Sequence, residues 1–233
     1  MQSPLAQDGG DGGSANRIVK INIATGATTQ YAYDNRITLG STTNADNSSE
    51  IVALNSHEFL VLERDGKGLG DGSVAVVKRL FKIDIAGAAD VSGLSGQAAL
   101  LAKAPVKSQF LDIKAALNAA GITDAMIPAK LEGMAFGADV MVGGLLKHTL
   151  FMANDNDFLG TVTVSGGGSV SYDNQFFAFA FGNDALAGTE FVAQDVATFA
   201  QVSDVTAVPE PETYALMLAG LAGIGCVARR RPS

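Results

Sequence analysis

The sequence predicts an all-β protein built from repeated antiparallel units, and two internal repeats are the main observations behind this prediction. In the first repeat, residues 17–24 (RIVKINIA) recur as residues 79–86 (RLFKIDIA). Both copies are rich in β-branched residues and too short for typical helices. The pair Thr25–Gly26 predicts a turn into a partner strand at 27–33, so the first copy opens a hairpin. Self-similarity of this kind indicates a repeated structural unit.

The second repeat is offset from the first, and each copy begins with a glutamate. Residues 50–54 lead to a strand at 59–65, and residues 132–136 lead to a strand at 149–155. One unit therefore runs from about residue 50 to 88 and another from about 132 to 181. Four-stranded units of roughly 40–45 residues are typical of β-propeller blades. We predict a partial β-propeller of about two blades after a remnant hairpin; an open sheet or sandwich of the same strands is the alternative.

Three further segments frame these units. Phe110, Ile113, Leu117 and Ala120 recur at helical spacing before Gly121, which predicts one short packing helix inserted between the units. Residues 1–16 are rich in glycine and aspartate, lack the features of a secretory signal and are expected to be disordered. Propellers have roughly four to eight blades. The domain at 17–205, which precedes a tail at 206–233, is therefore expected to be the C-terminal part of an N-terminally truncated propeller.

Charge and composition disfavour several functional classes. The formal net charge is -8, and an acidic body repels phosphates, so nucleic acid is not an expected partner. The one cysteine, Cys226, allows neither an intramolecular disulfide nor a Cys/His metal set. The chain has no Gly-x-Ser-x-Gly elbow and only two histidines, His57 and His148, which disfavours a Ser-His-Asp hydrolase.

The C-terminal tail combines a short motif, an apolar run and a basic end. Pro209, Glu210 and Pro211 precede the uncharged, mostly apolar residues 214–228, and Arg229, Arg230 and Arg231 follow. As a helix, the run would span roughly 22 Å at about 1.5 Å per residue, a marginal transmembrane length. The arginines predict a cytoplasmic end. A buried core helix is the alternative, but the terminal position and the arginines oppose it.

This order of motif, apolar helix and basic stop resembles the PEP-CTERM sorting signal of bacteria. The resemblance implies that exosortase, a membrane transpeptidase, is a partner and recognises the Pro209–Pro211 motif. It also implies insertion into a membrane through residues 214–228, followed by release to the cell surface or the extracellular space. The expected source is a Gram-negative bacterium.

Several motifs in the body resemble, in order, the esterase-like phytase family. They are residues 49–51, 60–65, 129–136, 153–158 and 175–179, and the resemblance covers about residues 17–190. It implies a propeller fold and the hydrolysis of phosphate esters. Because carboxylates in the central channel of β-propeller phytases hold calcium ions, the resemblance also implies calcium as a cofactor.

Acids at strand ends in successive units are expected to converge near one axis, where they offer the carboxylate oxygens that Ca²⁺ prefers. The candidate calcium ligands are Glu50, Glu63, Asp65, Glu132, Asp155 and Asp157, and the candidate phosphate-binding residues are Arg64 and Lys130. The alternative is that the acids cap turns. The glycine-rich run 65–72 lacks the pattern of a calcium loop or a phosphate loop, which predicts a flexible hairpin end.

Two functional hypotheses follow from the sequence. The first is an exported, exosortase-processed surface protein whose phytase-like domain hydrolyses an ester, in particular a phosphate ester, with calcium. The second is a non-catalytic extracellular protein that binds or supports exopolysaccharide. Exosortase and the membrane are expected partners under both hypotheses.

Overall fold

Antiparallel β-strands dominate the structure, a computed structural model that describes residues 3–10, 12–39 and 42–193. The described part is mostly β with a few short helices, so the predicted all-β class is confirmed. Its elements in chain order are η1 (Ala6–Asp8), β1 (Ala15–Ile21), β2 (Thr28–Asp34), β3 (Arg36–Leu39), β4 (Thr42–Ala45), β5 (Asn47–Ala53), β6 (Glu58–Arg64), β7 (Lys78–Asp84), α1 (Gln97–Leu101), β8 (Lys107–Asp112), α2 (Ile113–Ala119), β9 (Leu131–Val142), β10 (Leu145–Asn154), β11 (Thr161–Thr163), β12 (Ser169–Ser171), β13 (Phe176–Phe181) and η2 (Asn183–Leu186).

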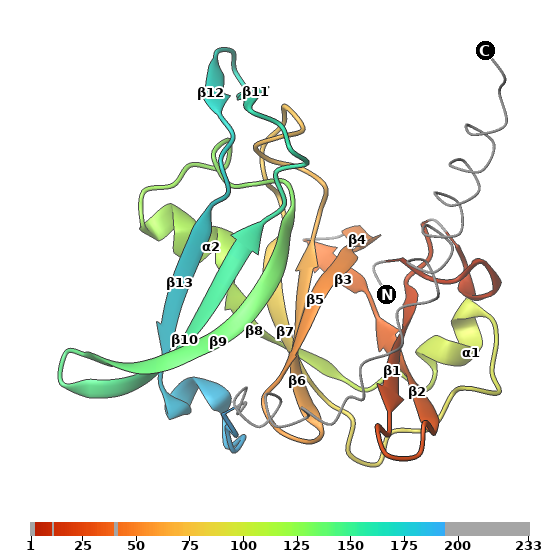
Figure 1. Cartoon of the computed structure of the whole chain (residues 1–233). Helices are drawn as coiled ribbons and strands as arrows, with labels where there is room; N and C mark the ends of the chain where they lie inside the picture. Colours follow the sequence, from red (N-terminus) through yellow and green to blue (C-terminus); the bar gives the residue numbers. More distant parts are fainter. Residues whose placement is uncertain (1–2, 11, 40–41, 194–233) are drawn as a thin grey trace, which may run out of the picture. The chain divides into compact units, whose positions relative to one another are not determined.

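The strands form two larger sheets and three two-stranded ribbons (Figure 1). In the four-stranded sheet, β5, β6, β7 and β8 pair in chain order, and every pair is antiparallel. In the three-stranded sheet, β10 lies between β9 and β13. The ribbons are β1–β2, β3–β4 and β11–β12. The sheets of the described residues do not close into a ring.

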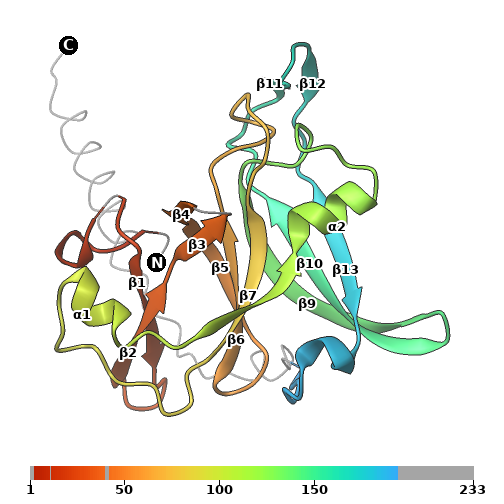
Figure 2. The same cartoon turned by 180° about the vertical axis from the view of Figure 1, so that it is seen from behind.

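The main hydrophobic core lies between the two larger sheets. Leu60 and Leu62 of β6 are buried with Leu150 and Met152 of β10 in one cluster. Because side chains alternate between the two faces of a strand, Leu60 and Leu62 share the face that meets the second sheet. Helix α2 adds Leu117 to the same cluster. Figure 2 shows this arrangement from behind, with α2 beside the strands that it covers.

The opposite face of the four-stranded sheet packs against the ribbon β1–β2. Val61 and Ile83 belong to a second buried cluster, in which they meet Tyr33 of β2. Three β-layers therefore follow one another in chain order: β1–β2, then β5–β8, then the β9-β10-β13 sheet (Figure 1).

The end of the domain is tied back to the four-stranded sheet. Lys82 Nζ on β7 donates to the Leu186 carbonyl (3.0 Å) and to the Thr189 hydroxyl (2.6 Å), and that hydroxyl donates to Glu58 Oε1 (2.5 Å). The Val192 N–H donates to the carbonyl of Leu54 (2.8 Å). We call this set of contacts, made by Leu54, Glu58, Lys82, Leu186, Thr189 and Val192, the terminal clasp.

Both internal repeats form strands, as predicted, although β1 belongs to a two-stranded ribbon and β7 is an inner strand of the four-stranded sheet. The first repeat forms β1 and β7, and near the end of each copy a side chain accepts a hydrogen bond from the backbone N–H two residues on. The acceptor is Asn22 in the first copy (3.0 Å) and Asp84 in the second (2.7 Å). Gly26 and Gly87 follow at the same φ of +71°, a left-handed conformation that favours glycine. The second repeat forms the hairpins β5–β6 and β9–β10.

The inserted helix is present as α2, but it begins later than the spacing of Phe110 indicated. Phe110 lies in β8, where its ring packs edge-on against Phe181 with 5.2 Å between ring centroids. Asp112 caps the helix by accepting a hydrogen bond from the Ala115 N–H (2.9 Å), so the helix starts at the next residue. The helix ends before Gly121, as predicted. The short helix α1 was not predicted, because five residues are too few to show helical periodicity.

Two segments for which the sequence predicted disorder or flexibility are held by specific contacts. Within residues 3–10 and 12–16, the turn η1 places Asp8 at 0% exposure against Arg17, whose Nε lies 2.6 Å from Asp8 Oδ2. In the glycine-rich run, the N–H of buried Leu69 donates to the Ile127 carbonyl (2.8 Å). A Cβ at Gly68 would lie 2.3 Å from that carbonyl oxygen, so only glycine allows this approach. The expected flexible hairpin end is a packed turn.

The features predicted at the C-terminus lie outside the part of the chain that the structure describes. These are the sorting motif at Pro209–Pro211 and the predicted membrane helix at 214–228. Within residues 3–193, apart from the gaps named above, none of the helices has the length and apolar character needed to cross a bilayer.

His148 links the part of the β9–β10 hairpin near its turn to η2. Its Nδ1 lies 2.9 Å from Asp139 Oδ1, and its Nε2 lies 2.7 Å from Asn183 Oδ1. Partial burial lowers the pKa of His148, but the hydrogen bonds with Asn183 and Asp139 and the charge of Asp139 outweigh it, so the pKa is raised. The protonated ring donates to both oxygens, which a neutral ring cannot do.

We expect His148→Gln to lose more stability at about pH 5.5 than at about pH 8.5, by about 1 kcal/mol, the difference between a charged and a neutral hydrogen bond. Because the pKa is raised in the folded state, this contribution is complete below the unfolded value of 6.5 and is lost as the pH rises through the folded value. Urea unfolding at both pH values measures the effect. Asp139→Asn should remove much of the same pH dependence, whereas equal losses at both pH values would contradict the assignment.

Candidate functional site

Charged residues gather where β6 ends and β9 begins. Arg64, the last residue of β6, is buried, and its Nη2 donates to Glu132 Oε1. Glu132 stands at the start of β9 and keeps 29% of its side chain exposed. Lys130 Nζ lies 4.0 Å from the same oxygen of Glu132. Glu132 therefore lies between two cations, one buried and one partly exposed.

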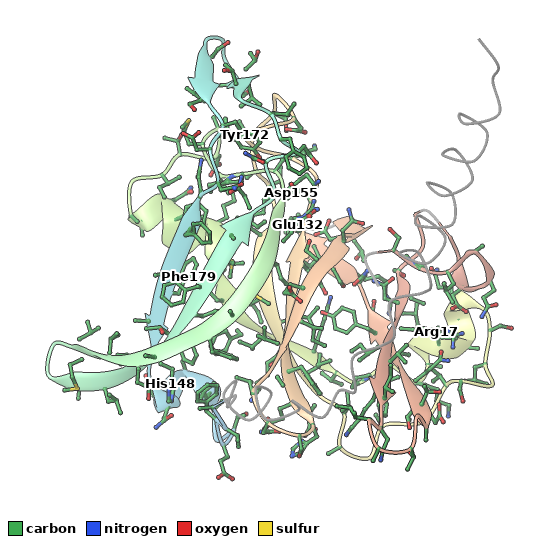
Figure 3. All side chains as sticks on the ribbon, in the orientation of Figure 1. Arg17, Glu132, His148, Asp155, Tyr172 and Phe179 are labelled. Atoms are coloured by element: carbon green, nitrogen blue, oxygen red, sulfur yellow. The ribbon has the colours of Figure 1, made fainter. Side chains whose placement is uncertain are left out.

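Lys130 links Glu132 to the loop after β10. Its Nζ donates to Asp155 Oδ2 (2.7 Å) and to Asp157 Oδ1 (2.6 Å), and the Asp155 N–H donates to the Lys130 carbonyl (2.9 Å). The hydrogen bonds to Asp155 and Asp157 raise the pKa of Lys130, and the hydrogen bond from Lys130 lowers the pKa of Asp155. Both groups therefore stay charged around neutral pH. Figure 3 shows Glu132 and Asp155 next to each other, below Tyr172.

The loop itself contains unusual backbone geometry. Asp157 and Phe158 have φ values of +51° and +58°, in the left-handed region that non-glycine residues rarely adopt. The side chain of Phe158 is fully exposed. Strain of this kind collects at functional sites, where surrounding contacts hold it in place. Here the holding contacts are hydrogen bonds from the Asp157 N–H to Asp155 Oδ1 (2.9 Å) and from the Phe158 N–H to Asn156 Oδ1 (3.1 Å).

Glu132 also faces a cleft of about 480 Å³ between β1, β5 and the start of β9. Glu50 lines the same cleft from β5, so the glutamates that open the two copies of the second repeat both border this cleft. The cleft is the size of a small-molecule site. Its polar lining includes Asn16, Ser48 and Ser49, and its apolar lining includes Ile18, Val19 and Val61.

Glu63 lies on the other face of β6 from Arg64, because neighbouring strand residues point in opposite directions. It is fully buried, and its Oε1 accepts hydrogen bonds from the Tyr33 hydroxyl (2.5 Å) and from Lys107 Nζ (2.5 Å). Burial, with a smaller effect of Asp46, raises the pKa of Glu63 against the opposing effects of Lys107 and Tyr33. This buried cluster joins β2, β6 and β8.

Asp65 binds a lysine and a turn. Its Oδ1 accepts from Lys78 Nζ (2.7 Å), and its Oδ2 accepts from the N–H groups of Val76 (2.9 Å) and Val77 (3.1 Å). Lys78, at 0% exposure, also donates to the carbonyls of Asp65, Lys67 and Ala129 at 2.9 to 3.0 Å. Asp65 therefore closes the loop between β6 and β7, the turn-capping role that was the alternative interpretation of these acids.

The six candidate calcium ligands do not come together as a metal site in this arrangement. Among the residues that the structure describes, no group of three or more His, Cys, Asp or Glu side chains is placed to hold a metal ion. All six except Glu50 form an ion pair with a lysine or arginine. The residues as placed do not fit a calcium ion, and calcium stays a prediction from the sequence.

Sequence reasoning missed the two lysines that neutralise Asp65 and Glu63. Lys78 lies 13 positions after Asp65, and Lys107 lies 44 positions after Glu63. The one available signal was the place of Lys78 directly after the apolar run 74–77, because a lysine is rarely buried without a partner. Chemically, the site offers carboxylates that can accept protons at a cleft and cations that can neutralise an anion.

Fold and site together define an all-β domain of packed antiparallel sheets in which a network of ion pairs borders a cleft. Residues 1–158 match the family described as Phytase-like: Esterase-like activity of phytase. The chain belongs to this family, as its motifs indicated, although the match starts before residue 17 and ends before β13.

Residues 207–231 match the PEP-CTERM protein-sorting motif. The match includes Pro209–Pro211 and the three arginines at 229–231. The chain is therefore an exported protein that exosortase sorts, with membrane anchoring before it reaches the surface. No curated protein and no solved structure matches this chain.

Proposed function

We propose that the chain is an exported ester hydrolase whose phytase-like domain cleaves phosphate esters in the cleft between β1, β5 and β9. One observation supports this proposal most directly: Glu50 and Glu132 line the cleft, and Lys130 lies beside Glu132. Phosphate ester hydrolysis needs a base for the attacking water and cations for the charge on the phosphoryl oxygens. The family supplies the expected class of reaction.

Each residue has a proposed role. Glu50 is the better base, because Glu132 is already paired with Arg64; its carboxylate accepts a proton from water as the water oxygen bonds to phosphorus. The bond from phosphorus to the ester oxygen breaks, and the leaving oxygen takes a proton from solvent. Lys130, with 31% of its side chain exposed, meets the phosphoryl oxygens. Buried Arg64 is a positioning residue that holds Glu132.

Glu50→Gln is expected to lower kcat by about 100-fold, or about 2.7 kcal/mol, because the amide cannot accept the proton. The measurement is phosphate release from a phosphomonoester and from phytate by the full chain. Glu190→Gln makes the same chemical change at an exposed position outside the cleft and should leave kcat unchanged. A Glu50→Gln variant with the kcat of the parent would overturn the role of Glu50.

The calcium prediction is tested in the same assay. Turnover that is lost with a chelator and restored by added calcium would support it. Turnover that is unchanged by the chelator would end it while leaving the proposed cleft chemistry intact.

The proposal extends to the architecture and the membrane. The three β-layers are parts of neighbouring blades of a β-propeller, supported by the chain-order pairing of β5 to β8 and by the face-to-face packing of the layers. Residues 214–228 cross the inner membrane of a Gram-negative bacterium until exosortase processes the chain.

One observation favours the rival function, a non-catalytic exopolysaccharide-associated protein. All the candidate acids except Glu50 are already neutralised by lysine or arginine, as in a structural network. This rival predicts no phosphate release by the parent chain and retention of the chain on immobilised exopolysaccharide.

A further inference from the structure

The tip of the β9–β10 hairpin exposes a group of large apolar side chains. Val140, Met141 and Val142 precede the Gly143–Gly144 turn, and Leu145 and Leu146 follow it. The exposed fractions are 40%, 65%, 51%, 62% and 61%. Figure 1 shows this tip extending away from the body of the domain, beyond the end of β13. We call these seven residues, 140–146, the apolar tip.

Both faces of the apolar tip are apolar. Met141 pairs with Leu146 in the strand register, and Val142 pairs with Leu145. Paired residues share a face and successive residues alternate, so the two pairs lie on opposite faces. A hairpin that packs on a protein surface needs one apolar face and leaves the other to water. Exposure of apolar groups on both faces is what an element that enters a lipid phase requires.

The tip ends in a polar boundary. Directly behind it, Asp139 and His148 are hydrogen-bonded to each other, and Lys147 pairs with Val140 in the register. The apolar tip itself contains no charged residue. At about 3.4 Å per residue, its three residues before the turn measure roughly 10 Å, which matches the roughly 5–10 Å depth of interfacial elements in a bilayer.

Backbone hydrogen bonding limits how deep this hairpin can go. The cross-strand pairing continues to Val142 and Leu145, so the inward-facing backbone groups are satisfied up to the turn. β9 is an edge strand of its sheet, so the outer N–H and C=O groups of the tip have no neighbouring strand among the described residues. Unpaired backbone groups are not tolerated in the hydrocarbon core. The headgroup and acyl boundary is therefore the depth that suits the tip.

The sorting tail brings the domain to a membrane. Residues 194–206 separate the described domain from the PEP-CTERM motif at 207–231. Even fully extended, at roughly 3.5 Å per residue, this connection measures at most about 45 Å. While the motif is anchored, the tip is held at a high effective concentration next to the lipid, and weak insertion then suffices.

We propose that the apolar tip of the β9–β10 hairpin inserts into the interface of the phospholipid bilayer while the sorting tail anchors the chain. A second copy of the chain fits less well, because a standard protein interface uses roughly 20–30 residues a side and the tip offers five apolar side chains. The inference does not depend on the proposed hydrolysis, because the tip is at the far end of β9 from Glu132.

The experiment uses the full chain in phosphatidylcholine vesicles. In a Cys226→Ser background, an environment-sensitive fluorophore is attached at Met141→Cys, and quenching by lipids with brominated acyl chains is measured. The control carries the same fluorophore at Val106→Cys, which is 90% exposed in the parent chain and lies away from the tip. We expect quenching at position 141 to exceed that at position 106 by about tenfold, because only the tip places the fluorophore among the acyl chains.

A substitution pair tests the cause. Leu145→Ser with Leu146→Ser should reduce the quenching at position 141 by about tenfold, because the variant lacks two leucine side chains that would move from water into the lipid interface. The matched pair Ile21→Ser with Ile23→Ser, at equally or more exposed sites, should not reduce it. Equal quenching at positions 141 and 106 would overturn the proposal. Fluorophore burial that appears without lipid and rises with protein concentration would also overturn it, in favour of a second copy.

Discussion

Replacing Lys78 with methionine is expected to destabilise the domain by about 3–5 kcal/mol, the effect of breaking a buried ion pair by removing one partner. Lys78 is completely buried, and its three N–H donors serve the Asp65 carboxylate and three carbonyls. Methionine fills a similar volume, so the loss is mainly that of uncompensated polar groups. The Asp65 carboxylate would be left in the fold without its cation.

Urea unfolding followed by circular dichroism measures this effect. Lys103→Met makes the same substitution at an exposed position and should change the free energy of unfolding by less than about 0.5 kcal/mol. Because the loop between β6 and β7 depends on Lys78, proteolysis of the Lys78→Met variant should begin between residues 65 and 77. A Lys78→Met variant as stable as Lys103→Met would show that the four hydrogen bonds contribute nothing.

Arg17→Met is expected to lower the free energy of unfolding by about 3 kcal/mol, the low end for a broken buried pair because the N-terminal segment lies at the edge of the domain. Arg17 holds Asp8 with two hydrogen bonds, at 2.6 and 3.0 Å, and donates to the carbonyls of Val91 (3.0 Å) and Leu94 (2.7 Å). One side chain thereby joins η1, β1 and the loop before α1. Removing the Arg17 side chain therefore removes the hydrogen bonds that hold these three segments to one another.

The pH dependence of this pair has a definite sign. The hydrogen bond from Arg17, opposed by burial and aided by the Gly96 N–H, lowers the pKa of Asp8 below 3.8. The stability from the pair is therefore present above the unfolded value and is lost as the pH falls through the folded value. Arg36→Met, at an exposed pair with Asp34, should cost less than about 1 kcal/mol. Equal losses from Arg17→Met and Arg36→Met would contradict the importance of burial.

The fold was predictable where a local pattern repeats. Residues 17–24 and 79–86 each form a strand, and at or just after its end Asn22 and Asp84 make the same local hydrogen bond, accepting from the N–H two residues on. Phe110 misled the helix prediction for a tertiary reason: its edge-on contact with Phe181, 71 positions away, places it in a strand. Contacts of that range leave no local periodicity to detect.

The site was predictable in position more than in chemistry. Acids and cations at strand ends do meet, since Arg64 contacts Glu132 and Lys130 contacts Asp155. The sequence pattern could not show which acidic side chain forms an ion pair with which lysine or arginine. Glu63 was a candidate metal ligand because of its position in the strand. Its Oε1 instead forms an ion pair with Lys107, which lies on a strand that the sequence did not predict.

The terminal clasp has a consequence for the timing of folding. Within the clasp, Leu54, Glu58 and Lys82 bond to Leu186, Thr189 and Val192, which lie up to 138 positions later in the chain. A chain that crosses a membrane emerges gradually, and the four-stranded sheet remains without these bonds until nearly the whole domain has passed. The residues that complete the fold are thus among the last of the domain to cross the membrane. A partly translocated chain therefore remains incompletely folded, so that it can still slide back through the membrane or be degraded by proteases.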